Sequence, residues 1–210
     1  FKDEPLKIKL FSNSITNKFL KKIMKTILKK ISTTVAFFAI VLSANAQKSY
    51  TLDAKTNFSV FGTSTLHDWE MKSASKTGTA NLTVTNSKLT AITSIDITLP
   101  VETIKSEKTK MDKIAYETLK TDKHKNIKYV LKSAEKVNET TWNLTGTYTI
   151  AGVSKEHKTQ VKSSVTNGIV NLQGSNKITF KEFGMKSPTA MLGTIKTGEN
   201  LTIKFSINFK

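Results

Sequence analysis

Residues 142–150 read WNLTGTYTI, and residues 201–209 read LTIKFSINF. In both stretches an apolar or small residue occupies every second position, and the residues between them are mostly threonine, asparagine, serine and lysine. A period of two is typical of a β-strand that buries one face. Both stretches are long for a strand of a small sandwich, and both place large aromatic side chains on the buried face. They therefore favour a barrel over a sandwich, although alternation alone is compatible with either.

The same alternation recurs along most of the chain. It is present in residues 58–60, 82–84, 95–101, 127–131 and 178–180, with short polar segments between them. About eight strands with turns every 8–12 residues predict an all-β fold. We expect an eight-stranded antiparallel barrel in one domain over residues 47–210. A closed sheet of this size has an interior that side chains fill or that holds one small ligand.

One segment departs from this period. Residues 108–122 read KTKMDKIAYETLKTD, in which Met111, Ile114, Ala115 and Leu119 follow helical spacing. We expect one short helix of about three turns here, inserted between two strands.

The first 46 residues have the features of an export signal. Residues 24–46 read MKTILKKISTTVAFFAIVLSANA, with three lysines before an unbroken apolar run at 35–42 and a small-residue cleavage pattern that ends at Ala46. Eight apolar residues fall short of the roughly 20 that span a bilayer. We expect a signal peptide cleaved near Ala46, and a periplasmic or secreted bacterial protein. Residues 1–23 are an extension of doubtful status.

The charge of the chain argues against nucleic-acid binding. The net charge is +17, and residues 47–210 keep +10 of it. All 33 basic residues are lysine, whereas arginine supplies the bidentate contacts that read guanine and clamp phosphate. We therefore expect no nucleic-acid partner. Scattered lysines leave open a loose attraction to anionic lipid headgroups, and the sequence leaves a homodimer open.

Few residues suggest catalysis or metal binding. Without cysteine the chain has no disulfide, no cysteine-bound zinc and no thiol nucleophile. The three histidines, His67, His124 and His157, lack zinc-site spacing. His67 precedes Asp68 and is the one candidate for acid–base chemistry, the alternative being a loop histidine that hydrogen-bonds a turn. We predict no catalytic residue, no metal site and no enzyme.

Five stretches carry a resemblance to a known family. They are FSVFGTSTLHDW at 58–69, MDKIAYETLKTDKHKNIKY at 111–129, LTGTYTIAGVSK at 144–155, FKEFGM at 180–185 and GENLTIKFSINF at 198–209. In this order the mature chain resembles the YceI-like proteins, the polyisoprenoid-binding, lipocalin-like barrels of bacteria. The resemblance implies an eight-stranded barrel with one helix that encloses an isoprenoid quinone or another polyisoprenoid. It implies no required cofactor.

The inward positions of the strands, together with flat or flexible apolar side chains near them, give the predicted ligand-binding set. Its members are Phe58, Val60, Trp69, Ile97, Leu99, Met111, Ile114, Leu119, Tyr129, Trp142, Leu144, Tyr148, Phe180, Phe183, Met185 and Phe205. The three helical residues Met111, Ile114 and Leu119 would cover one mouth of the barrel.

Three functions are compatible with the sequence. The first is a non-enzymatic carrier of an isoprenoid or quinone-like lipid in the cell envelope. The second is a structural or stress-related interaction protein whose interior is filled by its own side chains, with no cavity above roughly 300 Å³, the lower limit for small-molecule pockets. The third is an enzyme that acts on a lipid through His67 or a pair of carboxylates. The family resemblance favours the first.

Overall fold

The structure, a computed structural model, describes residues 47–210; the predicted signal peptide and the extension before it lie outside these residues. The described strands are β1 (Lys48–Thr51), β2 (Asn57–Ser64), β3 (Trp69–Ser73), β4 (Thr77–Thr85), β5 (Lys88–Pro100), β6 (Ile104–Lys105), β7 (Asn126–Lys136), β8 (Thr141–Ile150), β9 (Val153–Thr166), β10 (Ile169–Thr179), β11 (Thr189–Ala190) and β12 (Ile195–Phe209). The helices are α2 (Thr109–Thr118) and the short 3₁₀ turns η1 (Val101–Thr103) and η2 (Lys181–Phe183).

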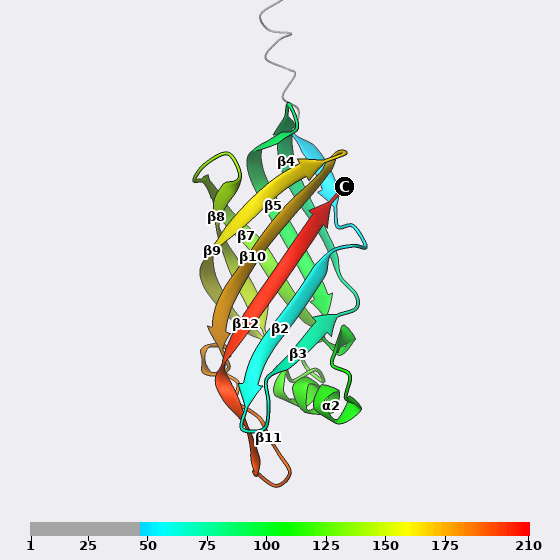
Figure 1. Ribbon diagram of the computed structural model, residues 1–210, viewed down its shortest axis with the longest axis vertical. Coiled ribbons are helices and arrows are strands. Elements are labelled where there is room, and N and C mark those ends of the chain that lie inside the picture. Colours follow the sequence, from blue (N-terminus) through cyan, green and yellow to red (C-terminus); the bar gives the residue numbers. More distant parts are fainter. Residues whose placement is uncertain (1–46) are drawn as a thin grey trace, which may run out of the picture. The chain divides into compact units, whose positions relative to one another are not determined.

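The strands form one antiparallel sheet that curls on itself (Figure 1). Their order is β1-β4-β5-β7-β8-β9-β10-β12-β2-β3-β6, and β11 pairs with β12 beside this path. The end of β1 meets the end of β12, because Thr51 and Lys210 exchange two backbone hydrogen bonds of 3.0 Å and the amide of Asp53 donates to Asn208 O over 2.8 Å. The sheet therefore closes, and the expected all-β antiparallel barrel with one short helix is confirmed.

The number of strands differs from the expected eight. Three of the expected strands are each interrupted and therefore count as two strands. The resulting pairs are β1 and β2, β3 and β4, and β5 and β6, the last pair being separated by η1. β11 is an additional strand of two residues, which makes twelve. The break in β5 follows Pro100, whose ring removes the amide that a continuing ladder would use. Short irregular segments of this kind leave the hydrophobic alternation on each side intact, so the sequence does not reveal them.

The alternation sorts the side chains as expected. Along β8 every second residue from Trp142 to Ile150 is buried, and in β7 Tyr129 points inward while Lys128 and Val130 are exposed. The inward residues form two apolar clusters. The first cluster contains Leu82, Trp142, Val170 and Phe209 among others, and the second contains Tyr148, Ile178, Phe180 and Leu201. Within residues 47–210 the sheet closes around both clusters, so we expect this part of the chain to fold by itself.

Alternation of apolar residues does not reveal β9 beyond its first residues. Two of its inward positions are the buried polar residues Thr159 and Ser163, which flank Val161. Apolar and polar residues therefore do not alternate here, although the backbone does. β9 nevertheless pairs with the whole of β8, from Val153 opposite Ile150 to Lys162 opposite Thr141.

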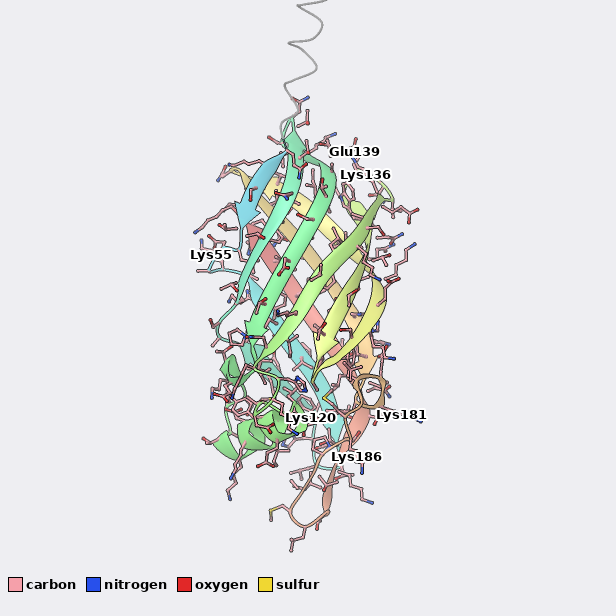
Figure 2. All side chains as sticks on the ribbon, turned by 180° about the vertical axis from the view of Figure 1, so that it is seen from behind. Lys55, Lys120, Lys136, Glu139, Lys181 and Lys186 are labelled. Atoms are coloured by element: carbon pink, nitrogen blue, oxygen red, sulfur yellow. The ribbon has the colours of Figure 1, made fainter. Side chains whose placement is uncertain are left out.

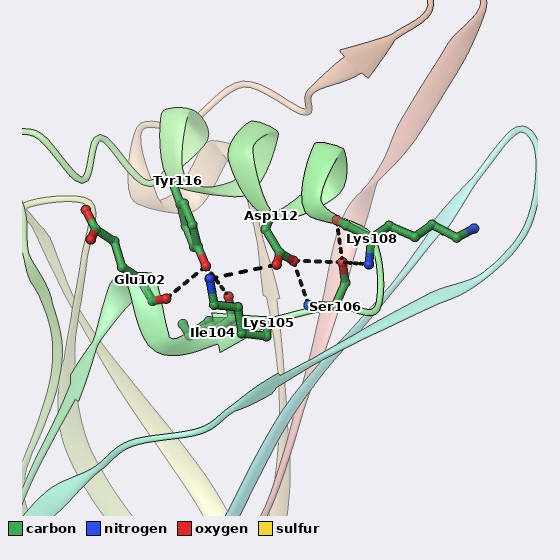
Figure 3. Close-up of polar contacts among 7 residues, drawn as sticks. All are labelled: Glu102, Ile104, Lys105, Ser106, Lys108, Asp112 and Tyr116. Carbon is green, nitrogen blue, oxygen red and sulfur yellow. Dashed lines mark hydrogen bonds and ion pairs between the residues drawn. The ribbon is translucent and has the colours of Figure 1, made fainter.

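The predicted helix is confirmed as α2, with ten residues, and a polar network fixes its start (Figure 3). The Oδ1 atom of Asp112 accepts hydrogen bonds from the amide and the hydroxyl of Ser106, both over 2.7 Å. The hydroxyl of Tyr116 donates to the carbonyls of Glu102 and Ile104 over 2.9 and 3.0 Å. The ammonium of Lys105 donates a hydrogen bond to the phenol oxygen of Tyr116, and this contact raises the lysine pKa above its ordinary value. No helix between residues 47 and 210 is both long enough and apolar enough to cross a bilayer.

Candidate binding cavity

A cavity of about 430 Å³ lies inside the barrel, next to α2. Nearly every strand of the barrel and the helix contribute to its wall, and most of the contacting side chains are aliphatic or aromatic. The first apolar cluster fills the rest of the interior, at the end away from α2. Pockets for small molecules range from roughly 300 to 1,000 Å³ and are mostly apolar. The cavity therefore has the size and the chemistry of a site for an apolar ligand.

Fourteen of the sixteen predicted ligand-binding residues line this cavity. They are Phe58, Val60, Trp69, Ile97, Leu99, Met111, Ile114, Leu119, Tyr129, Leu144, Tyr148, Phe180, Met185 and Phe205. The strand residues reach the same space because alternate positions face one side of a sheet. Met111 and Ile114 reach it from α2, and Leu119 reaches it from the position directly after the helix, as helical spacing requires.

Two predicted residues do not line the cavity. Trp142 is inward and buried, but it lies near the start of β8 and packs in the first cluster, which closes the far end of the barrel. Phe183 is fully buried in η2, where its ring stacks on His157 with 6.1 Å between ring centres. Alternation gives the face of a strand but not the depth along the barrel axis. That missing depth is why the alternation places Trp142 inward but does not separate it from the residues that line the cavity.

Several lining residues were not predicted. Ile95, Ile150, Ile178, Leu201, Ile203 and Ile207 are inward members of strands that the alternation had already shown. The alternation could have identified these six. The turn residues from Pro188 to Met191 also reach the cavity, and no periodic signal marks them.

Three aromatic side chains of the wall lie over glycines of neighbouring strands. A Cβ atom at Gly62 would overlap the ring of Trp69, and one at Gly146 would overlap the ring of Tyr129. At Gly174 it would approach Phe205 Cζ to 2.7 Å. The missing Cβ atoms allow the three rings to lie close to the sheet. The glycines therefore widen the space that remains for a ligand.

A small cluster of polar side chains interrupts the apolar wall. The rings of Tyr129 and Tyr148 lie 4.9 Å apart, and burial raises the pKa of both hydroxyls above the ordinary value of 10.0. The side chains of Thr159 and Asn176 lie close enough to Tyr148 to oppose this rise, although neither makes a hydrogen bond of good geometry. Both phenols are therefore neutral at physiological pH. Tyr148 and Thr159 also line the cavity, although the hydroxyl oxygen of Thr159 is itself buried.

Basic side chains line the mouth of the cavity. Lys108 and Lys110 are the only charged residues of the described lining, which contains no aspartate or glutamate. The Nδ1 atom of His67 lies 2.7 Å from Asp68 O, and its Nε2 atom lies 3.4 Å from Lys108 Nζ. These contacts are those of a loop histidine, because the ring meets a backbone oxygen and an amine rather than a carboxylate. Between residues 47 and 210, no three His, Asp or Glu side chains gather as metal ligands would.

Comparison with known families gives a match over nearly all of the described chain. The model of the YceI-like domain matches residues 50–209. The chain belongs to the YceI-like family. The resemblance seen in the sequence is thereby confirmed, over the same residues that form the barrel. Comparison with curated proteins gives no match.

Solved structures show the same fold at low sequence identity. BcnA from Burkholderia cenocepacia has a TM-score of 0.63 at 15% identity, and the match covers 75% of this chain and 98% of that chain. A polyisoprenoid-binding domain from Saccharophagus degradans has a TM-score of 0.61 at 10% identity, with 77% and 97% covered. The YceI protein of Campylobacter jejuni has a TM-score of 0.50 at 22% identity, with 63% and 81% covered. The YceI-like barrel is thus shared by proteins whose sequences have diverged widely.

Proposed function

We propose that this YceI-like barrel binds and carries an isoprenoid or quinone-like lipid without acting as an enzyme. The observation that carries the proposal is the cavity of about 430 Å³ with its largely apolar lining. Each methylene group moved from water into such a lining contributes roughly 0.8 kcal/mol. A long chain therefore needs few polar contacts, which agrees with a lining that is mostly aliphatic and aromatic.

The alternative, an interaction barrel filled by its own side chains, predicts no cavity above roughly 300 Å³. The larger cavity argues against it. Family membership and the likeness in fold to a polyisoprenoid-binding domain support the choice of ligand class. The bound lipid is cargo, and no cofactor is part of the proposal.

The setting is the cell envelope. The predicted signal at residues 24–46 supports export, with the mature barrel starting near Gln47 in the periplasm or outside the cell. An aqueous compartment is where an apolar chain needs a carrier, because its transfer through water is unfavourable.

The test is calorimetric titration of the barrel, residues 47–210, with farnesol, a short isoprenoid alcohol. Leu99→Trp places extra volume in the cavity, because Leu99 lines it from β5. Displacing even two methylene groups of the ligand costs about 1.6 kcal/mol, so we expect farnesol binding to weaken at least about tenfold. Leu131→Trp is the matched control, since Leu131 is also partly buried against the first cluster but does not line the cavity.

We expect Leu131→Trp to change the farnesol affinity less than about twofold, because the cavity keeps its volume. Thermal unfolding of both variants confirms that each remains folded at the titration temperature. Equal affinity in the wild type and in Leu99→Trp would show that farnesol binds elsewhere. No heat of binding in any of the three proteins would remove the proposal.

A further inference from the structure

Exposed apolar side chains gather at the mouth of the cavity. Of the large apolar side chains between residues 47 and 210, five are well exposed, and three of these are at the α2 end: Leu66, Met191 and Leu192. Leu66 and Met191 also line the cavity, and Leu192 is fully exposed. Figure 1 shows that the β11–β12 hairpin, which carries Met191 and Leu192, projects beyond the barrel at this end. Exposed apolar groups collected in one place mark a site of interaction.

The hairpin tip has bulky apolar residues at positions where turns usually have glycine or asparagine. Met191 and Leu192 have φ angles of 52° and 56°, in the left-handed region that bulky residues rarely adopt. The turns at Asn86–Ser87 and at Asn167–Gly168 have the same sign of φ but place short polar residues or glycine there. Strain and exposure at the same two residues indicate that the apolar tip serves a purpose other than folding.

Positive charge surrounds these apolar groups. Lys108 and Lys110 lie on the cavity mouth, and Lys186 and Lys196 are exposed on either side of the hairpin tip. Figure 2 shows Lys186 at the same end of the barrel as Lys120 and Lys181, opposite Lys136 and Glu139. No acidic residue lies between residues 183 and 198. Residues 101–125 carry five acidic residues beside seven lysines, so the local excess of positive charge on this segment is small. The net charge of +10 over residues 47–210 would therefore attract the protein to a negatively charged surface, and the apolar tip would decide which end of the barrel faces that surface.

We infer that the α2 end of the barrel docks on an anionic lipid bilayer, with Leu192, Met191 and Leu66 inserted at the headgroup level. Lysines near an anionic surface are attracted to it, and apolar side chains that enter the interface leave water. The cavity mouth then faces the bilayer, so a chain can pass between membrane and barrel without crossing water. This last step rests on the proposed function, whereas docking itself does not.

The absence of cysteine allows the inference to be tested by site-specific labelling. Leu192→Cys in the barrel carries an environment-sensitive NBD group at the hairpin tip. Vesicles of phosphatidylcholine with about one-third phosphatidylglycerol should raise its fluorescence and shift it to the blue, because the probe enters an apolar layer. Val137→Cys with the same label is the control. Val137 is 49% exposed and lies between Lys136 and Glu139 at the opposite end (Figure 2).

Vesicle flotation with unlabelled variants measures the contribution of the tip. Leu192→Ser should lower the partition coefficient onto the anionic vesicles about tenfold, since one inserted leucine accounts for that factor. Val137→Ser should change it less than twofold. Pure phosphatidylcholine vesicles should bind the wild type far more weakly. The inference is overturned if the labels at 192 and 137 respond alike, or if Leu192→Ser binds like the wild type.

Farnesol titration of Leu192→Ser separates this inference from the proposed function. Leu192 does not line the cavity, so this variant should bind farnesol like the wild type while it loses vesicle binding. Docking without farnesol binding in the wild type would support the inference and contradict the carrier. Farnesol binding without docking would support the carrier and contradict the inference.

Discussion

In each glycine–aromatic contact of the barrel wall, the glycine and the aromatic ring come from neighbouring strands. Gly62 lies opposite Trp69, and Gly174 lies opposite Phe205. The sequence placed Trp69 and Phe205 in the predicted ligand-binding set, and both line the cavity. It could not predict which glycine lies under which ring, because that depends on the register between strands. The surface of the cavity is therefore less predictable from sequence than the list of residues that line it.

The contact between Gly146 and Tyr129 gives a prediction at this scale. Gly146→Ala adds a methyl group where the ring of Tyr129 already lies, and overpacking of this kind costs about 1–3 kcal/mol of the free energy of unfolding. Chemical denaturation measures the loss. In a Tyr129→Leu background the ring is absent, and Gly146→Ala should then cost less than half as much. The same cost in both backgrounds would mean that the ring does not cover Gly146.

Among the elements, α2 was the most predictable, whereas β9 was only partly visible in the sequence. Met111, Ile114 and Leu119 give α2 a clear helical period, and all three line the cavity. Thr159 and Ser163 hide the alternation of β9, because these inward residues are polar. The apolar turn at Met191 and Leu192 carries neither a period nor a favoured turn residue, so sequence reasoning overlooked the hairpin entirely.

The attachment of α2 to the barrel gives a prediction at the scale of the element. Asp112→Ala leaves the partly buried amide of Ser106 without its acceptor, which costs about 1–3 kcal/mol of the free energy of unfolding. Hydrogen exchange should show faster exchange across α2 than in the wild type. Glu117→Ala is the matched control, an exposed acidic residue on the same helix, and should change stability by no more than about 0.5 kcal/mol. Equal protection of α2 in the two variants would contradict the role given to Asp112.

For the whole molecule, the sequence predicted an all-β barrel with an apolar interior, but not how much of that interior stays empty. The inward residues and their order come from alternation, while the free volume depends on how the sheet closes and on where Trp142, Phe183 and the glycines lie. The first cluster fills one end of the barrel, and the cavity of about 430 Å³ occupies the other. This division suits the proposed carrier, since one half supplies stability and the other half supplies space.

The most direct test is native mass spectrometry of the protein exported by a bacterial host and purified without detergent. We predict a species heavier than the polypeptide by the mass of one chain lipid, which organic solvent removes and which offered isoprenoid restores. Only the polypeptide mass, in repeated preparations and after incubation with farnesol and with a long-chain quinone, would contradict the account.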